Sequence, residues 1–250
     1  MFSLLLHRSP QQEDLLVADL FEWGATGIAE EEQGIRAFFD GDADCTTLLA
    51  RFRDFAPEVR EEQAVDWAAV SRDAFPPLLI GQQFYLVAPW DASETPEGRL
   101  RLEIEPGMAC GTGRHPATQL CLEALEASVT PGVSVLDVGT GSGILSEAAR
   151  LLGAGRVIGC DIDLEAVQIA RERIGVTLFA GSADAIRARS QEIIVANIDS
   201  AAIESLAGEL SRIRKPQSKL ILSGFPKHDL PAGFQPQTIL TREEWACLIC

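Results

Sequence analysis

Residues 133–163 read VSVLDVGTGSGILSEAARLLGAGRVIGCDID, and this stretch decides the fold. The pattern predicts a strand, a glycine-rich turn, a helix and a second strand, at residues 133–137, 139–143, 144–152 and 156–161. This order is typical of the first half of a nucleotide-binding βαβ unit. The glycines of the turn let a ligand lie against the backbone, and Asp161, at the end of the second strand, is placed to hold ribose hydroxyl groups.

The spacing of the glycines distinguishes two classes of ligand. A dinucleotide site follows the pattern G-x-G-x-x-G, in which a pyrophosphate rests on the helix N-terminus, but Ile144 stands where the third glycine belongs. Asp137, just before the turn, would repel a pyrophosphate and favour a cation. S-adenosylmethionine carries a sulfonium and an ammonium group and no phosphate. We therefore expect this cofactor, with a nicotinamide dinucleotide or a purely structural turn as the alternatives.

The C-terminal part of the chain alternates between predicted strands and helices. Five strands and a closing antiparallel hairpin are expected at residues 134–138, 157–161, 176–179, 192–197, 219–223, 235–240 and 245–249. Such alternation predicts an α/β, Rossmann-like fold with a mostly parallel, seven-stranded sheet. Ligands bind at the carboxyl ends of parallel strands, which places Gly139, Asp161 and Asn197 at one edge.

The N-terminal part predicts a smaller unit of a different kind. Strands are expected at 2–6, 26–30, 34–39 and 58–63, and helices at 11–23 and 46–52. This βαββαβ order predicts a small ferredoxin-like α+β domain. We expect three parts: a small domain at 1–63 that recruits a substrate, a linker at 64–98 and the domain that binds S-adenosylmethionine at 99–250.

Composition limits the partners and the location. The chain of 250 residues has no apolar run near the ~20 residues of a membrane span and no secretory signal, so we expect a cytoplasmic protein without membrane contact. With 37 acidic and 21 basic residues, the net charge of -16 argues against direct nucleic-acid binding and favours a basic protein partner. The six cysteines lack the spacing of metal ligands, so we expect no metal.

A second set of motifs carries a family resemblance. Residues 105–118 read EPGMACGTGRHPAT, and further matching segments are DVGTGSGIL at 137–145, DID at 161–163, ANI at 196–198 and LSG at 222–224. Together they resemble the methyltransferases of large-subunit ribosomal protein eleven, and G-T-G-x-H-P-x-T is the most specific mark. The resemblance implies a class I methyltransferase that uses S-adenosylmethionine to methylate amino groups, of lysine or of the N-terminus, on that ribosomal protein.

Four residues match the cofactor-binding residues of that family: Thr118, Gly139, Asp161 and Asn197. Thr118 follows Pro116 in the first turn of a predicted helix, where its hydroxyl can reach the methionine end of the cofactor. Asn197 presents a carbonyl and an amide group at the sheet edge, and we expect it also to orient the acceptor amine. Each of the four residues also has a purely structural alternative: helix initiation for Thr118, a tight turn for Gly139, a strand-end cap for Asp161 and turn formation for Asn197. Asp137, just before the turn, and Gly141 and Gly143 within it complete the predicted cofactor site.

His115 and several departures from the family pattern leave alternatives open. His115 is a candidate general base, or a residue that orients or packs. The chain has Cys110 where the family usually has Phe, and DSAAI at 199–203 where the family has LAGPL after Asn-Ile. Because segment 199–203 borders the expected acceptor entrance, two other functions stay open. One is a methyltransferase for another protein or a small molecule, and the other is a non-catalytic binding module.

Overall fold

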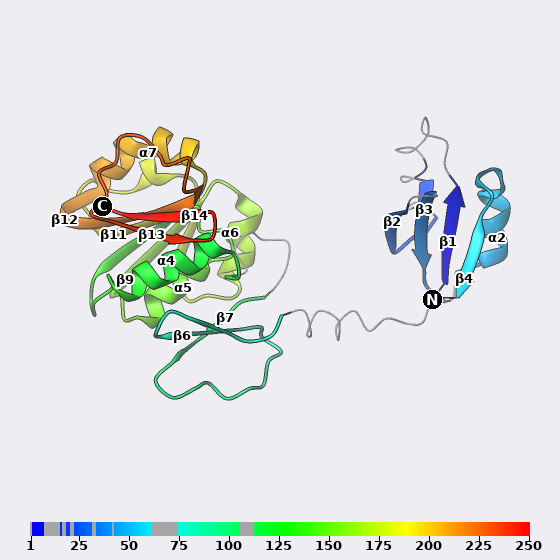
Figure 1. The fold of residues 1–250 in the computed structure, drawn as a ribbon, viewed down its shortest axis with the longest axis horizontal. Helices are drawn as coiled ribbons and strands as arrows, with labels where there is room; N and C mark the ends of the chain where they lie inside the picture. The colour runs from blue at the N-terminus through cyan, green and yellow to red at the C-terminus, as the bar shows by residue number, and fades with distance from the viewer. Residues whose placement is uncertain are drawn as a thin grey trace. The chain divides into compact units, whose positions relative to one another are not determined.

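The computed structural model describes residues 2–7, 16, 19–20, 23–31, 34–41, 43–61, 75–105 and 113–250. The chain divides into two compact units, Met1–Ser71 and Arg72–Cys250. The predicted boundary at residue 63 lies outside the described residues. Figure 1 draws both units, which are treated separately below.

The smaller unit is built on a four-stranded antiparallel sheet in the order β2-β3-β1-β4. Its elements are β1 (Phe2–His7), β2 (Gly27–Glu31), β3 (Gly34–Phe39), α2 (Cys45–Arg51), a 3-10 helix (Arg53–Phe55) and β4 (Glu58–Glu61). Alternate residues of β1, Leu4 and Leu6, pack with Phe39 and with Phe52 after α2 in one buried cluster. This strand order is the one a βαββαβ chain forms, and the four predicted strands are confirmed. Most of the helix predicted at 11–23 lies outside the described residues.

The larger unit contains a seven-stranded sheet in the order β10-β9-β8-β11-β12-β14-β13. Its strands are β8 (Ser134–Val138), β9 (Arg156–Asp161), β10 (Thr177–Ala180), β11 (Gln191–Asn197), β12 (Arg214–Pro226), β13 (Thr238–Arg242) and β14 (Trp245–Ile249). The first five strands in chain order pair in parallel, and β14 runs antiparallel to both β12 and β13. The predicted mostly parallel sheet is therefore confirmed.

Helices cover both faces of this sheet, as Figure 1 shows. They are α4 (Pro116–Glu126), α5 (Ile144–Leu151), α6 (Leu164–Arg171), a 3-10 helix (Ala183–Ala185) and α7 (Ser200–Ile213). Val135 packs with α4 and α5 on one face, and the next residue of β8, Leu136, packs with α7 on the other. Because successive side chains of a strand point to opposite faces, a strand buried on both sides reads as an unbroken apolar run.

The predicted linker at 64–98 is wrong for its described part. Residues 75–98 contribute to a three-stranded sheet in the larger unit, made of β5 (Leu78–Ile80), β6 (Phe84–Val87) and β7 (Leu100–Glu103). Phe84 and Leu86 are buried in the same core as α4. The Glu126 carboxylate, in the last turn of α4, accepts the backbone N–H groups of Gln82 (2.9 Å) and Gln83 (2.8 Å). The packing of Phe84 and Leu86 makes these strands part of the core of the larger unit.

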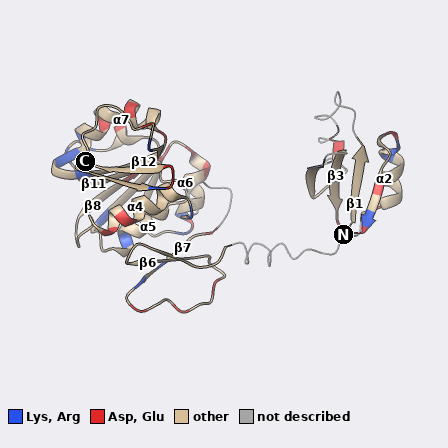
Figure 2. Cartoon of the chain, viewed as in Figure 1, with Lys and Arg blue, Asp and Glu red and all other residues tan. Residues whose placement is uncertain are grey.

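Strand β12 is longer than predicted, because it begins at Arg214 rather than Lys219. The Arg214 guanidinium donates to the Ser218 hydroxyl and carbonyl (both 2.9 Å), so a polar segment without an apolar pattern extends the strand. Figure 2 shows basic residues on β12 and acidic residues on α7. None of the helices in the described residues is long and apolar enough to cross a membrane.

Candidate active site

The glycine turn follows β8 and is held against the next strand by its backbone. The N–H groups of Gly139 and Thr140 both donate to the Cys160 carbonyl, at 2.8 and 3.0 Å. Gly139 and Gly141 have φ angles of 72° and 51°, in the left-handed region where residues with a Cβ are strained. A Cβ on Gly139 would come within 2.4 Å of the Ile198 side chain. The turn therefore requires glycine, and its backbone is open to a ligand.

Asp137 lies beneath this turn and is fully buried. One carboxylate oxygen accepts the hydroxyl groups of Thr140 (2.7 Å) and Ser146 (2.8 Å), and the other has no partner among the described residues. Burial raises the pKa of Asp137 to about 6, although the two hydroxyl donors lower it. Asp137 is not among the residues that line the pocket described below, and its predicted contact with the cofactor stays a prediction. Its visible role is to support the turn.

Asp161 ends β9 beside the turn. One carboxylate oxygen accepts the Gly141 N–H at 2.8 Å, and the other accepts the Asp163 N–H at 3.0 Å. A carboxylate oxygen has two lone pairs, so each oxygen of Asp161 can accept one more donor. Asp161 lines the pocket, where those lone pairs are available to a ligand with two hydroxyl groups.

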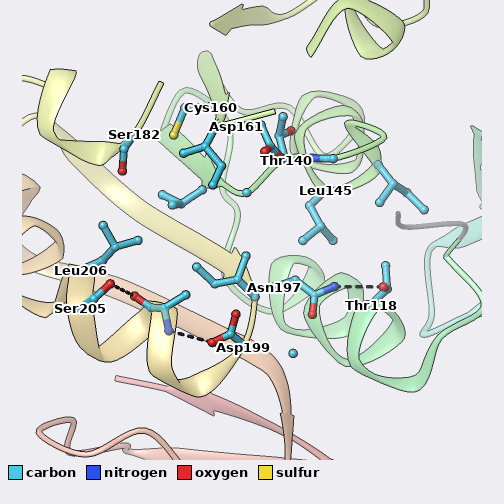
Figure 3. Close-up of a pocket in the computed structure, with 18 of the residues that line it drawn as sticks. Thr118, Thr140, Leu145, Cys160, Asp161, Ser182, Asn197, Asp199, Ser205 and Leu206 are labelled. Carbon is cyan, nitrogen blue, oxygen red and sulfur yellow. Dashed lines mark hydrogen bonds between the residues drawn. The ribbon is translucent and has the colours of Figure 1, made fainter. Parts of the chain in front are cut away.

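Asn197 and Thr118, predicted separately, form a hydrogen-bonded pair. Asn197 ends β11, and its amide Nδ2 donates to the Thr118 hydroxyl at 3.1 Å (Figure 3). Thr118 lies in the first turn of α4, where Pro116 occupies the first helical position and His115 is the cap. With Nδ2 engaged, the Asn197 carbonyl oxygen is the group that can accept a donor from a ligand.

One pocket of about 930 Å³ brings most of these residues together. Five of the seven predicted cofactor residues line it: Thr118, Gly139, Gly141, Asp161 and Asn197. Gly143 does not line it. With a φ of 82°, Gly143 caps α5, and a Cβ there would lie 2.3 Å from the Ile174 side chain, so this glycine serves helix packing. Among the described residues no group of His, Cys, Asp and Glu could hold a metal ion.

The pocket also contains residues that sequence reasoning did not assign to it. Ile162, directly after Asp161, is 85% exposed and presents an apolar surface at the pocket. Asp199 and Trp245 line the pocket as well. The exposure of Ile162 could have been predicted from the sequence, since an apolar residue between two aspartates in a turn is not expected to be buried in the core. No local sequence pattern indicates that Trp245 lines the pocket, because β14 lies near the pocket only when the whole sheet has assembled.

His115 packs and caps, as one of its two interpretations had it. Its ring Nδ1 accepts the Ala117 N–H at 3.3 Å, and its ring meets the Trp245 ring edge-on with centroids 4.3 Å apart and an interplanar angle of 73°. These contacts hold the start of α4 against the β13–β14 hairpin. Arg242 strengthens the same junction by donating to Gln119 and, at 2.7 Å, to Glu123 of α4.

Comparison with known proteins identifies a family that the chain resembles. The family model described as "Ribosomal protein L11 methyltransferase (PrmA)" matches residues 8–250. A relative of that name from Burkholderia ambifaria (strain MC40-6) is 44% identical over 170 residues, which are 67% of this chain and 56% of that protein. A second, from Cupriavidus taiwanensis, is 34% identical over 238 residues, which are 88% of this chain and 80% of that protein.

A solved structure matches in fold. The crystal structure of a ribosomal protein L11 methylase from Lactobacillus delbrueckii subsp. bulgaricus superposes with a TM-score of 0.64 and 27% identity, covering 69% of this chain and 96% of that one. The match with the Burkholderia protein spans little more than half of that relative's length. The predicted Rossmann-like class I methyltransferase fold is confirmed by the sheet and by this likeness. The chain therefore belongs to the ribosomal protein L11 methyltransferase family.

Proposed function

We propose that this protein transfers methyl groups from S-adenosylmethionine to amino groups of ribosomal protein L11, on lysine or at the N-terminus. The observation that carries the proposal is that the Asn197–Thr118 pair lies in one pocket with the glycine turn and Asp161. A nucleoside anchor and an amide that can orient an amine are thus held within reach of one ligand. Membership of the family supports the same reaction.

The residues present fit the cofactor. Asp161 has lone pairs for two ribose hydroxyl groups, and the exposed Ile162 provides an apolar face for a base. Gly139 has no side chain that would keep a ligand away from the backbone. The described lining contains two carboxylates and no Lys or Arg, which suits a cationic ligand and not a pyrophosphate. The cavity lies within the ~300 to 1,000 Å³ typical of small-molecule sites. When bound, the cofactor supplies an electrophilic methyl group and its own leaving group.

The chain's own contribution is to orient a neutral amine. An amine with the reference lysine pKa of ~10.4 is neutral in about one molecule in 2,500 at pH 7, so the reactive form is scarce. The Asn197 carbonyl oxygen can accept an N–H of the amine and leave the nitrogen lone pair free for in-line attack. We assign Asn197 as the residue that orients the acceptor, together with its role beside the cofactor.

The smaller unit supplies the substrate-recruiting role in this proposal. Residues 1–60 hold twelve acidic and five basic residues, so they attract a basic ribosomal protein while it is free of RNA. Direct nucleic-acid binding is not part of the proposed activity, because the net charge is -16. The reaction then takes place in the cytoplasm, where ribosomal proteins are made.

A radiolabelled methyl-transfer assay tests the proposal. Purified ribosomal protein L11 and a lysate from the same cell serve as acceptors, and an Asn197→Ala variant serves as the inactive control. We expect label on L11, located by mass spectrometry at lysine or N-terminal amines, and loss of most label with the variant. Label only on another protein or on a small molecule would replace the proposed acceptor, and no label at all would favour a non-catalytic binding module.

A further inference from the structure

Asp199 is an acidic residue on the pocket wall that takes no part in the proposed cofactor site. It caps α7: one carboxylate oxygen accepts the Ala202 N–H at 2.8 Å, as Figure 3 shows. Its second oxygen has no hydrogen-bond partner in the part of the chain that the structure describes. Asp161, the other lining carboxylate, receives a backbone N–H on each oxygen. Of the four carboxylate oxygens of Asp161 and Asp199, the second oxygen of Asp199 is therefore the one that receives no hydrogen bond from the described residues.

The position of Asp199 assigns it to the acceptor side of the pocket. Figure 3 draws Asn197 and Thr118 away from Asp161, so if Asp161 held the nucleoside, Asn197 and Thr118 would hold the end of the cofactor that carries the methyl group. Asp199 follows Asn197 by two residues and lines the same pocket. Figure 3 draws both Asn197 and Asp199 away from Asp161, so an acceptor that meets the Asn197 carbonyl oxygen would enter on the side of the pocket that Asp199 lines.

Charge moves toward this carboxylate during the reaction. The acceptor first loses a proton to solvent, and its nitrogen then forms a bond to the methyl carbon with its lone pair. The bond from that carbon to sulfur breaks with its electrons left on sulfur, so the positive charge moves from sulfur to nitrogen. A fixed negative charge near the nitrogen stabilises both the arriving ammonium group and the charge that develops in the transition state.

We propose that Asp199 is a specificity-determining residue that selects cationic amine acceptors through its free carboxylate oxygen. The proposal rests on the proposed methyl transfer and refines its acceptor. It also concerns this chain in particular, because Asp199 lies in the segment 199–203 that departs from the family pattern. An acceptor of the same shape that arrives uncharged would lack the attraction between this oxygen and an ammonium group, and is therefore disfavoured.

The competing interpretation is that Asp199 only caps α7. Asp199→Asn separates the two, because Asn is as good a helix cap as Asp and removes only the charge. Asp163 offers a matched control. It caps α6 by accepting the N–H groups of Glu165 (2.9 Å) and Ala166 (3.4 Å), and it does not line the pocket. Asp163→Asn thus removes the same charge from the same kind of cap.

The first measurement is steady-state methyl transfer to ribosomal protein L11. We expect Asp199→Asn to lower kcat/KM by about 10-fold, as loss of one charge-assisted contact does, with unchanged cofactor affinity. Asp163→Asn should stay within about twofold of the parent. Equal values for the two variants would leave Asp199 with its capping role alone.

The second measurement does not depend on turnover. The protein, saturated with S-adenosylhomocysteine, is titrated with Nα-acetyl-lysine amide and with its neutral counterpart, Nα-acetyl-norleucine amide. We expect the parent to prefer the lysine derivative by about fivefold and Asp199→Asn to show no preference. A parent without this preference would overturn the proposal. A parent that shows the preference but methylates no L11 would refute only the proposed function.

Discussion

The side of the pocket that we propose for the cofactor and the side that we propose for the acceptor are built in different ways. The cofactor side is formed by the glycine turn and Asp161, and backbone N–H groups of residues 139–141 make most of its hydrogen bonds. The acceptor side consists of side chains that are far apart in the sequence, from His115 to Trp245, and that meet only in the folded sheet. The ligand of the first side can therefore be recognised from a short motif, whereas the acceptor has to be inferred from three-dimensional contacts.

The largest expected effect concerns the buried charge under the cofactor side. The pKa of Asp137 is raised from 3.8 to about 6, so the unfolded chain loses this proton first and stability falls as pH rises from about 4 to 6. The shift corresponds to about 3 kcal/mol. We expect the unfolding free energy of Asp137→Asn, relative to the parent, to rise by about this amount between pH 4 and 7. Urea unfolding at several pH values measures it, and a difference independent of pH would contradict it.

Asp161→Ala tests how far the cofactor side depends on the Asp161 carboxylate. We expect S-adenosylmethionine affinity to fall by about 2 to 3 kcal/mol, or roughly 30- to 150-fold, because hydrogen bonds to a charged group are lost. Calorimetry measures the change, with Asp163→Asn as the control outside the pocket. Unchanged affinity would show that the turn alone anchors the ligand.

Gly139→Ala tests the backbone component of the same side. A φ of 72° and a Cβ 2.4 Å from the Ile198 side chain make alanine unfavourable, by about 1 to 2 kcal/mol for the left-handed conformation. We expect a lower melting temperature and weaker cofactor binding. Gly132→Ala is a useful comparison, since Gly132 has a φ of 90° and open space around it. If both variants lose cofactor affinity equally, the close approach at Gly139 is not part of the site.

Thr118→Val sharpens the acceptor side and has the smallest expected effect. The substitution keeps the shape and removes the hydroxyl group that accepts the Asn197 amide at 3.1 Å. A neutral hydrogen bond contributes about 0.5 to 1.5 kcal/mol, so we expect kcat/KM to fall about 2- to 10-fold. Thr118→Ser retains the hydroxyl and should stay near the parent. Equal losses in both variants would indicate packing rather than orientation of Asn197.

Sequence reasoning succeeded where the signal is local. The strand at 134–138, the glycine turn and the closing hairpin were all predictable, because an apolar run, three glycines and a polar turn each act within a few residues. It did not predict the support that Asp137 gives to the turn, because this support depends on the hydroxyl groups of Thr140 and Ser146. An acid before the turn looks the same in sequence whether it faces a ligand or the interior.

The same distinction explains the error in the predicted linker. Strands β5 and β6 have three and four residues, and such short segments do not show which core they pack against. Their place in the core follows from contacts with α4, which lies some 40 residues later and whose Glu126 accepts the N–H groups of Gln82 and Gln83. Trp245 is a similar case, since its contact with His115 depends on pairings across the whole sheet.

The position of β14 between β12 and β13 also has a consequence for biosynthesis. In a chain made from its N-terminus, β13 emerges from the ribosome before β14 but has no strand to pair with until β14 fills the gap. The nucleoside half of the sheet can assemble well before that event, because β8, β9 and β10 pair among themselves. During synthesis, the nascent protein should therefore become able to hold a nucleoside before Trp245 completes the wall against which an acceptor is positioned.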